Sequence, residues 1–255
     1  MPTPENPQPR KTALITGASG GIGRAFAGLL AEEGHDLVLV ARSSDELNRI
    51  TGVEMARHPV SVTPLPLDLA RHDAGDIIAD ELATRSISPD VLINNAGFGL
   101  NGPAASLPRT EQLALLDVNI RALSDLTLRF LPAMTERGAG GIINVSSVAA
   151  FLPGPHMAAY YASKAYVQTF STSLSRELKG TGVTVTALCP GPVKTGFQAR
   201  AGMDSTRLVY RLSRPQSAKA VALAGWTGFN EGKAVVYPRT SDMLMALAGK
   251  YLPAA

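Results

Sequence analysis

The chain has 255 residues, enough for one α/β domain with a large buried core. Its 45% hydrophobic and 18% charged residues lie in the globular range and exclude a disordered or collagen-like protein. The net charge of +3 comes from cations scattered along the chain rather than gathered in a stripe, which argues against nucleic-acid binding.

Residues 1–10 are rich in proline and lack the apolar run of a signal peptide, so we expect a disordered leader before a domain over 11–255. No stretch reaches the roughly 18 consecutive apolar residues of a transmembrane helix. The single cysteine, Cys189, cannot form an internal disulfide, which favours a reducing, cytoplasmic location. The four histidines lack metal-ligand spacing, so we expect no metal.

Short apolar runs alternate with segments of helical periodicity along the whole chain. The expected strands are 12–15, 36–41, 60–67, 91–93, 141–145, 184–188 and 234–237; the expected helices are 24–33, 45–57, 75–86, 109–136, 160–179, 216–227 and 241–251. The almost continuously apolar run 36–41 is typical of a strand buried on both faces of a parallel sheet. This order predicts a single-domain α/β fold, a doubly wound parallel sheet flanked by helices.

Periodicity weakens between residues 190 and 214, where Gly, Pro, Arg and Thr accumulate. A segment this long without regular structure favours a substrate lid. For the apolar C-terminal helix we favour packing on the body or on a partner subunit; a pocket cover or a membrane-surface contact is the weaker alternative.

The segment from Thr16 to Gly23 reads T-G-A-S-G-G-I-G, where the first strand gives way to the first helix. Glycines allow a sharp turn and a close approach of the backbone to a pyrophosphate, whose charge meets the helix N-terminus. The pattern predicts a dinucleotide site, and a tight turn without a ligand is the alternative.

Tyr160 and Lys164 lie four residues apart and would share one face of a helix. A phenol, with an ordinary pKa of about 10, exchanges protons at neutral pH only when positive charge stabilises its phenolate, and Lys164 can supply that charge. The pair predicts a general acid/base site, with a surface aromatic-lysine pair as the alternative.

The glycine-rich segment, the Tyr160 and Lys164 pair and the further segments named below resemble the motifs of the classical short-chain dehydrogenases/reductases. They occur in the order typical of that family, between Lys11 and about Tyr237. The resemblance implies a Rossmann-type fold and hydride transfer between nicotinamide C4 and a carbonyl/alcohol pair. The catalytic residues it implies are Asn119, Ser147, Tyr160 and Lys164. Ser147, 13 residues before Tyr160, would bond the substrate oxygen and Tyr160 would exchange the proton. Lys164 would bind the nicotinamide ribose, and Asn119 would hold a water.

The resemblance also implies a set of residues along the cofactor. They are Gly17, Ser19, Gly21, Ile22, Gly23, Asp68, Leu69, Asn95, Ala96, Gly97, Tyr160, Lys164, Pro190, Gly191, Val193 and Thr195. Asp68 and Leu69 would contact the adenine ring, and the segment from Pro190 to Thr195 would hold the nicotinamide carboxamide.

Cofactor choice is predicted from the end of the second strand. The position 18 residues beyond Gly23, where an acidic residue would bind the ribose 2′-hydroxyl, is Ala41, and Arg42 follows it. A guanidinium suits a 2′-phosphate, so we expect NADP(H), with NAD(H) as the fallback. A solvated loop cation is the alternative interpretation of Arg42.

Apolar side chains flank these motifs and predict a pocket for an apolar small molecule. They are Phe98, Phe151, Met157, Phe197 and Met203, with ordinary core packing as the alternative for each. By resemblance we expect a homodimer or homotetramer built on the helices that carry Asn119 and Tyr160.

Two other functions compete with this prediction. An NADP(H)-binding regulator on the same fold, with little or no turnover, would bind the cofactor in the same way. An epimerase or dehydratase of the related extended family would need a longer C-terminal domain and a different glycine spacing, so the length and motif disfavour it.

Overall fold

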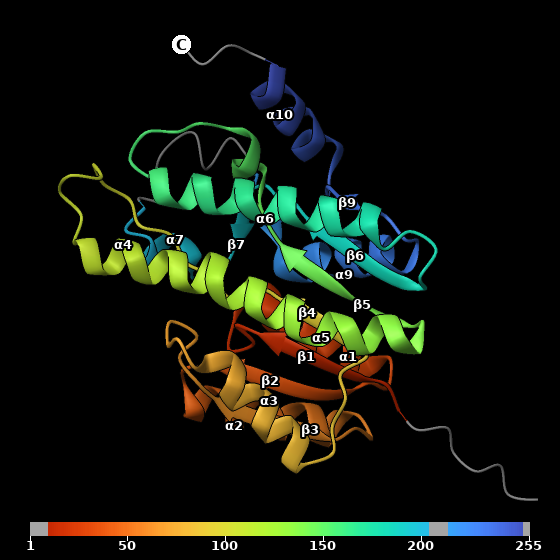
Figure 1. Cartoon of the computed structure of the whole chain (residues 1–255). Coiled ribbons are helices and arrows are strands. Elements are labelled where there is room, and N and C mark those ends of the chain that lie inside the picture. Colours follow the sequence, from red (N-terminus) through yellow and green to blue (C-terminus); the bar gives the residue numbers. More distant parts are fainter. Residues whose placement is uncertain (1–9, 204–213, 252–255) are drawn as a thin grey trace, which may run out of the picture.

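The computed structural model describes residues 10–203 and 214–251 of the chain. Its main sheet has seven parallel strands in the order β3-β2-β1-β4-β5-β6-β9 (Figure 1). These strands are β1 (Thr12–Thr16), β2 (Asp36–Ala41), β3 (Val62–Pro66), β4 (Val91–Asn94), β5 (Gly140–Val145), β6 (Val183–Leu188) and β9 (Val235–Val236).

Helices cover both faces of this sheet. The helices of the described residues, apart from one segment between α4 and α5, are α1 (Gly21–Glu32), α2 (Ser44–Arg57), α3 (Ala74–Thr84), α4 (Arg109–Leu116), α5 (Leu123–Arg137), the 3-10 helix η2 (Val148–Phe151), α6 (Ala158–Glu177), α7 (Phe197–Arg200), α9 (Ala218–Asn230) and α10 (Thr240–Tyr251). A second, two-stranded sheet pairs β7 (Val193–Lys194) with β8 (Gln216–Ser217).

The apolar strands are explained by burial on both faces. Along β1, Ala13 and Ile15 pack with the core formed by α1, α2 and α9, whereas Leu14 packs with the opposite core of α3, α5 and α6. Because successive side chains of a strand point to opposite faces, a central strand covered by helices must be apolar at nearly every position. The expected single-domain, doubly wound parallel sheet is therefore confirmed.

The long helix expected over 109–136 contains a break in its hydrogen-bonding pattern. A π-helical segment, η1 (Asp117–Ala122), joins α4 to α5. Inserted π turns change the direction in which the following side chains point and occur often at functional sites. Hydrophobic periodicity alone does not reveal this segment.

Two sequence expectations fall partly outside the described residues. Of the leader, only Arg10 is described. Of the expected lid, 190–203 and Arg214 are described and contain β7 and α7, while 204–213 lie outside. No described helix is both long and apolar enough to cross a membrane.

The strand order reverses between β1 and β4, because chain connections lead from β1 toward β2 on one side and from β4 toward β5 on the other. The loops at the carboxyl ends of these strands diverge there and leave a crevice, the usual ligand site of doubly wound sheets.

Candidate active site

A cavity of about 730 Å³ runs along the carboxyl edge of the sheet. It is lined by segments that follow β1, β2, β3, β4, β5 and β6. The sequence-predicted residues that line it are Gly17, Ser19, Gly21, Ile22, Arg42, Asp68, Leu69, Asn95, Ala96, Gly97, Phe98, Ser147, Met157, Tyr160, Lys164, Pro190, Gly191, Val193, Thr195, Phe197 and Met203.

Two glycines of the glycine-rich turn leave no room for a side chain. Gly17 has a φ of +65°, and a Cβ on it would lie 2.8 Å from Asn95 Nδ2. Gly21 has a φ of +55°, and a Cβ there would lie 3.0 Å from Thr195 Cγ2. Gly20, the N-cap of α1, offers no side-chain cap, so the first amides of this helix are available to an anion.

The turn is held against β4 by Thr16 and Asn95. Thr16 Oγ1 accepts hydrogen bonds from the amides of Asn95 and Ala96, both at 3.0 Å. In return, Asn95 Nδ2 donates to the carbonyls of Thr16 at 3.0 Å and Gly17 at 3.2 Å. These bonds tie the turn after β1 to the segment after β4, so the floor of the cavity is fixed without a ligand.

A buried polar network supports the same edge of the sheet from below. Asn94 Nδ2 donates to Asn144 Oδ1 at 2.9 Å and to Thr127 Oγ1 at 3.0 Å, and Asn144 Nδ2 donates to Ser171 Oγ at 2.9 Å. All four side chains are buried. Polar groups at such depth are costly unless they are bonded, so this network fixes how β4 and β5 pack on α5 and α6.

Asn119 lies in the π-helical segment and does not line the cavity. Its Nδ2 donates to the carbonyl of Phe98 and to Ser163 Oγ, each at 3.0 Å, while its Oδ1 accepts from the Phe98 amide at 3.1 Å. Ser163 Oγ in turn donates to the Tyr160 carbonyl at 2.7 Å. Asn119 is thus fully buried and links the segment after β4 to the helix that carries Tyr160.

Of the two serines after β5, Ser147 is the one whose hydroxyl influences the pKa of Tyr160. Ser146 Oγ donates to the Lys164 carbonyl at 2.8 Å and holds β5 on α6. Ser147 caps η2 by accepting from the Ala149 amide at 3.1 Å, and its Oγ donates to the Pro190 carbonyl at 3.4 Å. Its hydroxyl also lies close enough to Tyr160 to lower the pKa of that phenol. Both serines line the cavity, and the catalytic role of Ser147 stays a prediction.

Tyr160 lines the cavity and is half-buried. Burial raises the pKa of this phenol to about 12, and the hydrogen bond from Ser147 opposes that rise. In the protein alone the phenol is therefore protonated across the physiological range. It can donate a proton, and it would need added positive charge to become a base.

Lys164 lies beneath Tyr160 on the next turn of α6. Its Nζ donates to the Val145 carbonyl at 2.8 Å and lies 5.9 Å from the centroid of the Tyr160 ring. Burial lowers the pKa of this amine from 10.5 to about 8, because few groups replace its lost hydration. At neutral pH it still carries the positive charge that a neighbouring phenolate requires.

At the opposite end of the cavity, Ala41 ends β2 and exposed Arg42 follows it. Among the described residues, the guanidinium of Arg42 has no hydrogen-bond or ion-pair partner. A guanidinium that faces a cavity and has no protein partner can bind an anionic group of a ligand.

Three predicted site residues lie outside the cavity lining. A Cβ on Gly23 would collide with the Gly17 carbonyl oxygen, so this glycine allows the helix to pack against the turn. Asn119 lies behind the lining. Phe151 was expected in the substrate pocket, but its ring packs against Tyr237 with centroids 6.0 Å apart, and its neighbour Leu152 lines the cavity instead.

The cavity also includes residues that the motifs did not indicate. Tyr161, Arg200 and Met245 line it, and Met245 comes from α10. The i, i+1 neighbour of Tyr160 could have been suspected from its position. Met245 had no such signal, since the only clue was an apolar C-terminal helix with several possible partners.

The Rossmann-type fold, the glycine turn at the switch point and the Ser147, Tyr160 and Lys164 group define a nucleotide-binding oxidoreductase class. The family model described as short chain dehydrogenase matches residues 11–205. The chain belongs to this family.

Relatives support that assignment over most of the chain. Sulfoacetaldehyde reductase 2 of Chromohalobacter salexigens is 37% identical over 214 residues, which are 82% of this chain and 84% of that protein. A short chain dehydrogenase of Pseudocercospora fijiensis is 37% identical over 191 residues, 74% of this chain but 62% of the longer relative. The solved structure of a short-chain dehydrogenase from Sphingobium yanoikuyae in complex with NADPH is 31% identical, with a TM-score of 0.84 over 96% of this chain and 98% of that one.

Proposed function

We propose that the protein is an NADP(H)-dependent oxidoreductase that interconverts a carbonyl and an alcohol on an apolar small molecule. The observation that carries this proposal is one continuous cavity with Ser147, Tyr160 and Lys164 at one end and Arg42 at the other. A dinucleotide is the ligand that needs both ends at once.

The residues present fit such a cofactor. The turn at Gly17 and Gly21 excludes side chains and leaves backbone amides at a helix N-terminus, as a pyrophosphate requires. Arg42 would bind a 2′-phosphate, and Ala41 offers no carboxylate to repel it. The relative from Sphingobium yanoikuyae, which was solved with NADPH, supports the same preference.

The bound nicotinamide would supply the hydride that no protein side chain can provide. The protein's part is to hold and polarise the substrate oxygen. In the direction of reduction, Ser147 Oγ donates a hydrogen bond to the carbonyl oxygen, and Tyr160 donates its phenolic proton to that oxygen as the alcohol forms. The Lys164 ammonium stabilises the phenolate that Tyr160 becomes.

The substrate pocket beside Tyr160 is apolar. The Phe197 ring lies 5.3 Å from the Tyr160 ring, centroid to centroid, and Met157 and Phe197 both crowd the backbone at Gly99. Phe98, Leu152, Met203 and Met245 also line the cavity. This lining excludes water from the reacting oxygen and favours apolar ketones, aldehydes or quinones.

We further propose a cytoplasmic homodimer or homotetramer. Cys189 is a buried free thiol, as suits a reducing compartment. Leu113, Leu128 and Tyr166 are exposed apolar residues on α4, α5 and α6, the helices expected to pair between subunits.

Parallel titrations with NADPH and NADH, followed by nicotinamide fluorescence, test the cofactor assignment. Arg42→Ala should weaken NADPH binding by 1.5–3 kcal/mol, roughly ten- to a hundredfold, and leave NADH nearly unchanged. Arg57→Ala is the matched control, since Arg57 is exposed at the end of α2 and does not line the cavity. Equal losses for both cofactors would contradict the 2′-phosphate role.

Turnover is tested separately with a panel of apolar ketones, aldehydes and quinones, by following the oxidation of NADPH. Reduction of at least one compound is expected. A protein that binds NADPH tightly and reduces none of them would favour the regulator instead.

A further inference from the structure

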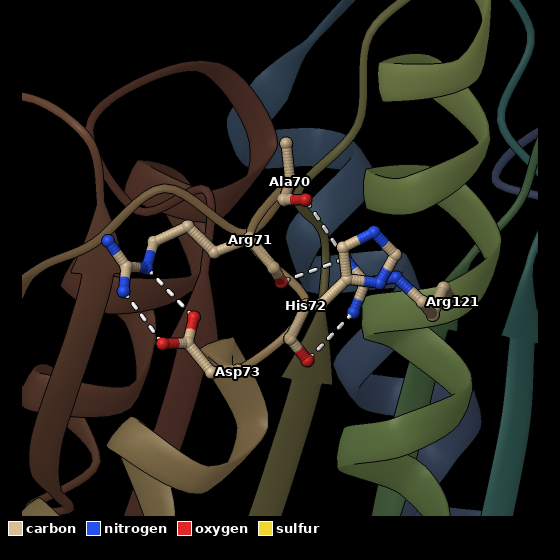
Figure 2. Close-up of polar contacts among 5 residues, drawn as sticks. All are labelled: Ala70, Arg71, His72, Asp73 and Arg121. Carbon is tan, nitrogen blue, oxygen red and sulfur yellow. Dashed lines mark hydrogen bonds and ion pairs between the residues drawn. The ribbon is translucent and has the colours of Figure 1, made fainter.

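Arg121 makes an unusual set of contacts with the loop between β3 and α3. Its Nη2 donates to the carbonyls of Ala70 at 3.0 Å and Arg71 at 2.8 Å, and its Nη1 donates to the carbonyl of His72 at 3.3 Å (Figure 2). Asp117 orients the guanidinium by accepting from Nε at 2.9 Å. One side chain thus holds three successive carbonyls of an exposed loop.

This loop forms the wall of the cavity next to Arg42. Asp68, Leu69 and Ala70 all line the cavity, and the Leu67 amide donates to the Ala41 carbonyl at 2.9 Å. The wall therefore lies beside the end of β2, far along the cavity from Tyr160. A dinucleotide bound as proposed would place its adenosine half here.

The other polar side-chain contacts described for the loop are local. Asp68 Oδ1 accepts from the Ala70 amide at 3.0 Å, and Arg71 forms a two-pronged ion pair with Asp73 (Figure 2). Such contacts shape the loop but do not attach it to the body of the protein. Attachment comes from the bond of the Leu67 amide to Ala41 at the start of the loop, from buried Leu69 and from Arg121. Leu69 anchors the loop at one buried side chain, whereas Arg121 bonds three successive carbonyls and so holds the backbone over residues 70–72.

Arg121 shares the π-helical segment with Asn119. Asn119 bonds the backbone at Phe98 on the catalytic side, while Arg121 bonds the backbone at 70–72 on the adenosine side. Residues two apart on an α-helix point in widely different directions, and η1 lets both reach a cavity wall. The segment fixes two walls of one cavity.

We propose that Arg121 is a positioning residue for the adenosine half of the cofactor. It holds the loop 67–73 in its binding conformation before the ligand arrives, so that binding does not have to order the loop. This inference rests on the proposed function. It differs from the role of Arg42, because the adenosine half is common to NADPH and NADH.

The test compares Arg121→Gln, Arg121→Lys and the control Arg129→Gln. Arg129 lies two turns further along on α5 and also reaches toward α3, but its hydrogen bonds within the described residues go to carboxylates, those of Asp76 at 2.8 Å and Asp125 at 3.2 Å. The dissociation constants of NADPH, NADH and adenosine 2′,5′-bisphosphate are measured by calorimetry for each protein. The kcat at saturating NADPH and amide hydrogen exchange over residues 67–73 are measured alongside.

Arg121→Gln should weaken all three ligands by a similar factor, roughly tenfold, with the NADPH-to-NADH ratio unchanged. Its kcat at saturating NADPH should stay within about twofold, and exchange over 67–73 should accelerate. Arg121→Lys, which keeps the charge but loses the fork, should show a smaller loss and keeps the test valid if the Gln variant does not fold. Arg129→Gln should leave every dissociation constant unchanged.

Unchanged dissociation constants in Arg121→Gln and Arg121→Lys would overturn the positioning role. So would a fall in kcat with binding intact, or a loss confined to NADPH. These comparisons start from wild-type protein that binds the ligands. Failure of the wild type to bind them would overturn the proposed function. Normal binding by the wild type with unchanged binding in the Arg121 variants would overturn the positioning role alone.

Discussion

The two ends of the cavity are stabilised in different ways. At the catalytic end, Lys164 is 5% exposed and is bonded to the backbone of β5, and Tyr160 is half-buried. At the adenosine end, Arg42 and Asp68 are exposed residues of loops. Burial shifts the pKa values of Tyr160 and Lys164. Recognition of a large polar ligand instead needs exposed groups whose backbone is held in place. Mutations at the two ends should therefore separate chemistry from binding.

The largest effect is expected for Tyr160→Phe. The change removes one hydroxyl and with it the proton donor, so turnover should fall by roughly 10²- to 10⁴-fold, the usual contribution of a general acid. NADPH binding should remain nearly unchanged, because the ring and Lys164 stay in place. The measurement is kcat by NADPH oxidation together with the dissociation constant from fluorescence.

Tyr161→Phe is the matched control, as the next residue on α6 also lines the cavity but has no hydrogen bond to Ser147 described. Substantial turnover in Tyr160→Phe would exclude the acid/base role. A parallel loss of cofactor binding would show that the two ends are not separable.

A second large effect concerns stability and its pH dependence. Because burial lowers the pKa of Lys164 from 10.5 to about 8, the folded protein binds its proton less tightly than the unfolded chain. The protonated amine therefore opposes folding fully below pH 8, and this penalty fades as pH rises from 8 to 10.5. At ~1.4 kcal/mol per pH unit, the penalty at neutral pH is of the order of 3 kcal/mol.

Lys164→Met should therefore raise the free energy of unfolding at pH 7 by up to about 3 kcal/mol, less the lost hydrogen bond to Val145, and abolish turnover. The gain should shrink between pH 8 and pH 10. Urea unfolding at pH 7 and pH 10 measures it, with exposed Lys179→Met as control. Lower stability than wild type at pH 7 would show that the ammonium is better solvated in the fold than its burial indicates.

A smaller effect is expected where α10 meets the catalytic end. Asp242 is 4% exposed, and its Oδ2 accepts from Gln216 Nε2 at 2.6 Å. Its other oxygen lies so close to Gly191 that a Cβ there would collide with it. Asp242 thus fastens the start of α10 to β8 and to the segment after β6, and Met245, three residues further, lines the cavity.

Asp242→Ala leaves the buried Gln216 amide without this partner and should cost about 1–3 kcal/mol of unfolding free energy. The KM for substrate should rise while the dissociation constant of NADPH stays constant, because Met245 lies on the helix that has lost its attachment. Unfolding curves and steady-state kinetics check both, with exposed Ser241→Ala as control. An unchanged KM would remove α10 from the substrate pocket.

The sequence predicts most of this architecture because the sheet is central and covered on both sides. Strand 36–41 has the expected bounds, since burial on both faces leaves no freedom in its composition. The Tyr160 and Lys164 pair was predictable for a similar reason, since helical spacing alone puts both on one face.

The contacts that the sequence did not reveal depend on tertiary geometry. The π-helical segment does not alter the apolar pattern of its helix, so the orientation of Arg121 toward the carbonyls of 70–72 had no local signal. Phe151 and Leu152 are adjacent and both apolar, and only the fold decides which of them faces the cavity. Asp242 and Gln216 are 26 residues apart, and nothing in either segment alone indicates a buried pair.

The smallest effect is expected for Arg71→Ala, a change in the loop at the adenosine end of the cavity. Arg71→Ala breaks the two-pronged ion pair with Asp73, whose bonds of 2.9 and 2.7 Å are as short as those of Arg121. Both partners are exposed, however, so water replaces the interaction and we expect no measurable change in stability or in the dissociation constant of NADPH. Thermal unfolding and the cofactor titration test this beside Arg121→Gln.

Weaker NADPH binding in Arg71→Ala would mean that the Arg71–Asp73 ion pair, and not the bonds of Arg121 to the backbone, gives the loop its shape. Arg71 and Arg121 bond the same loop at similar lengths. A difference between Arg71→Ala and Arg121→Gln in their effect on NADPH binding therefore comes from the burial of the bonds and from the groups that the two arginines bond.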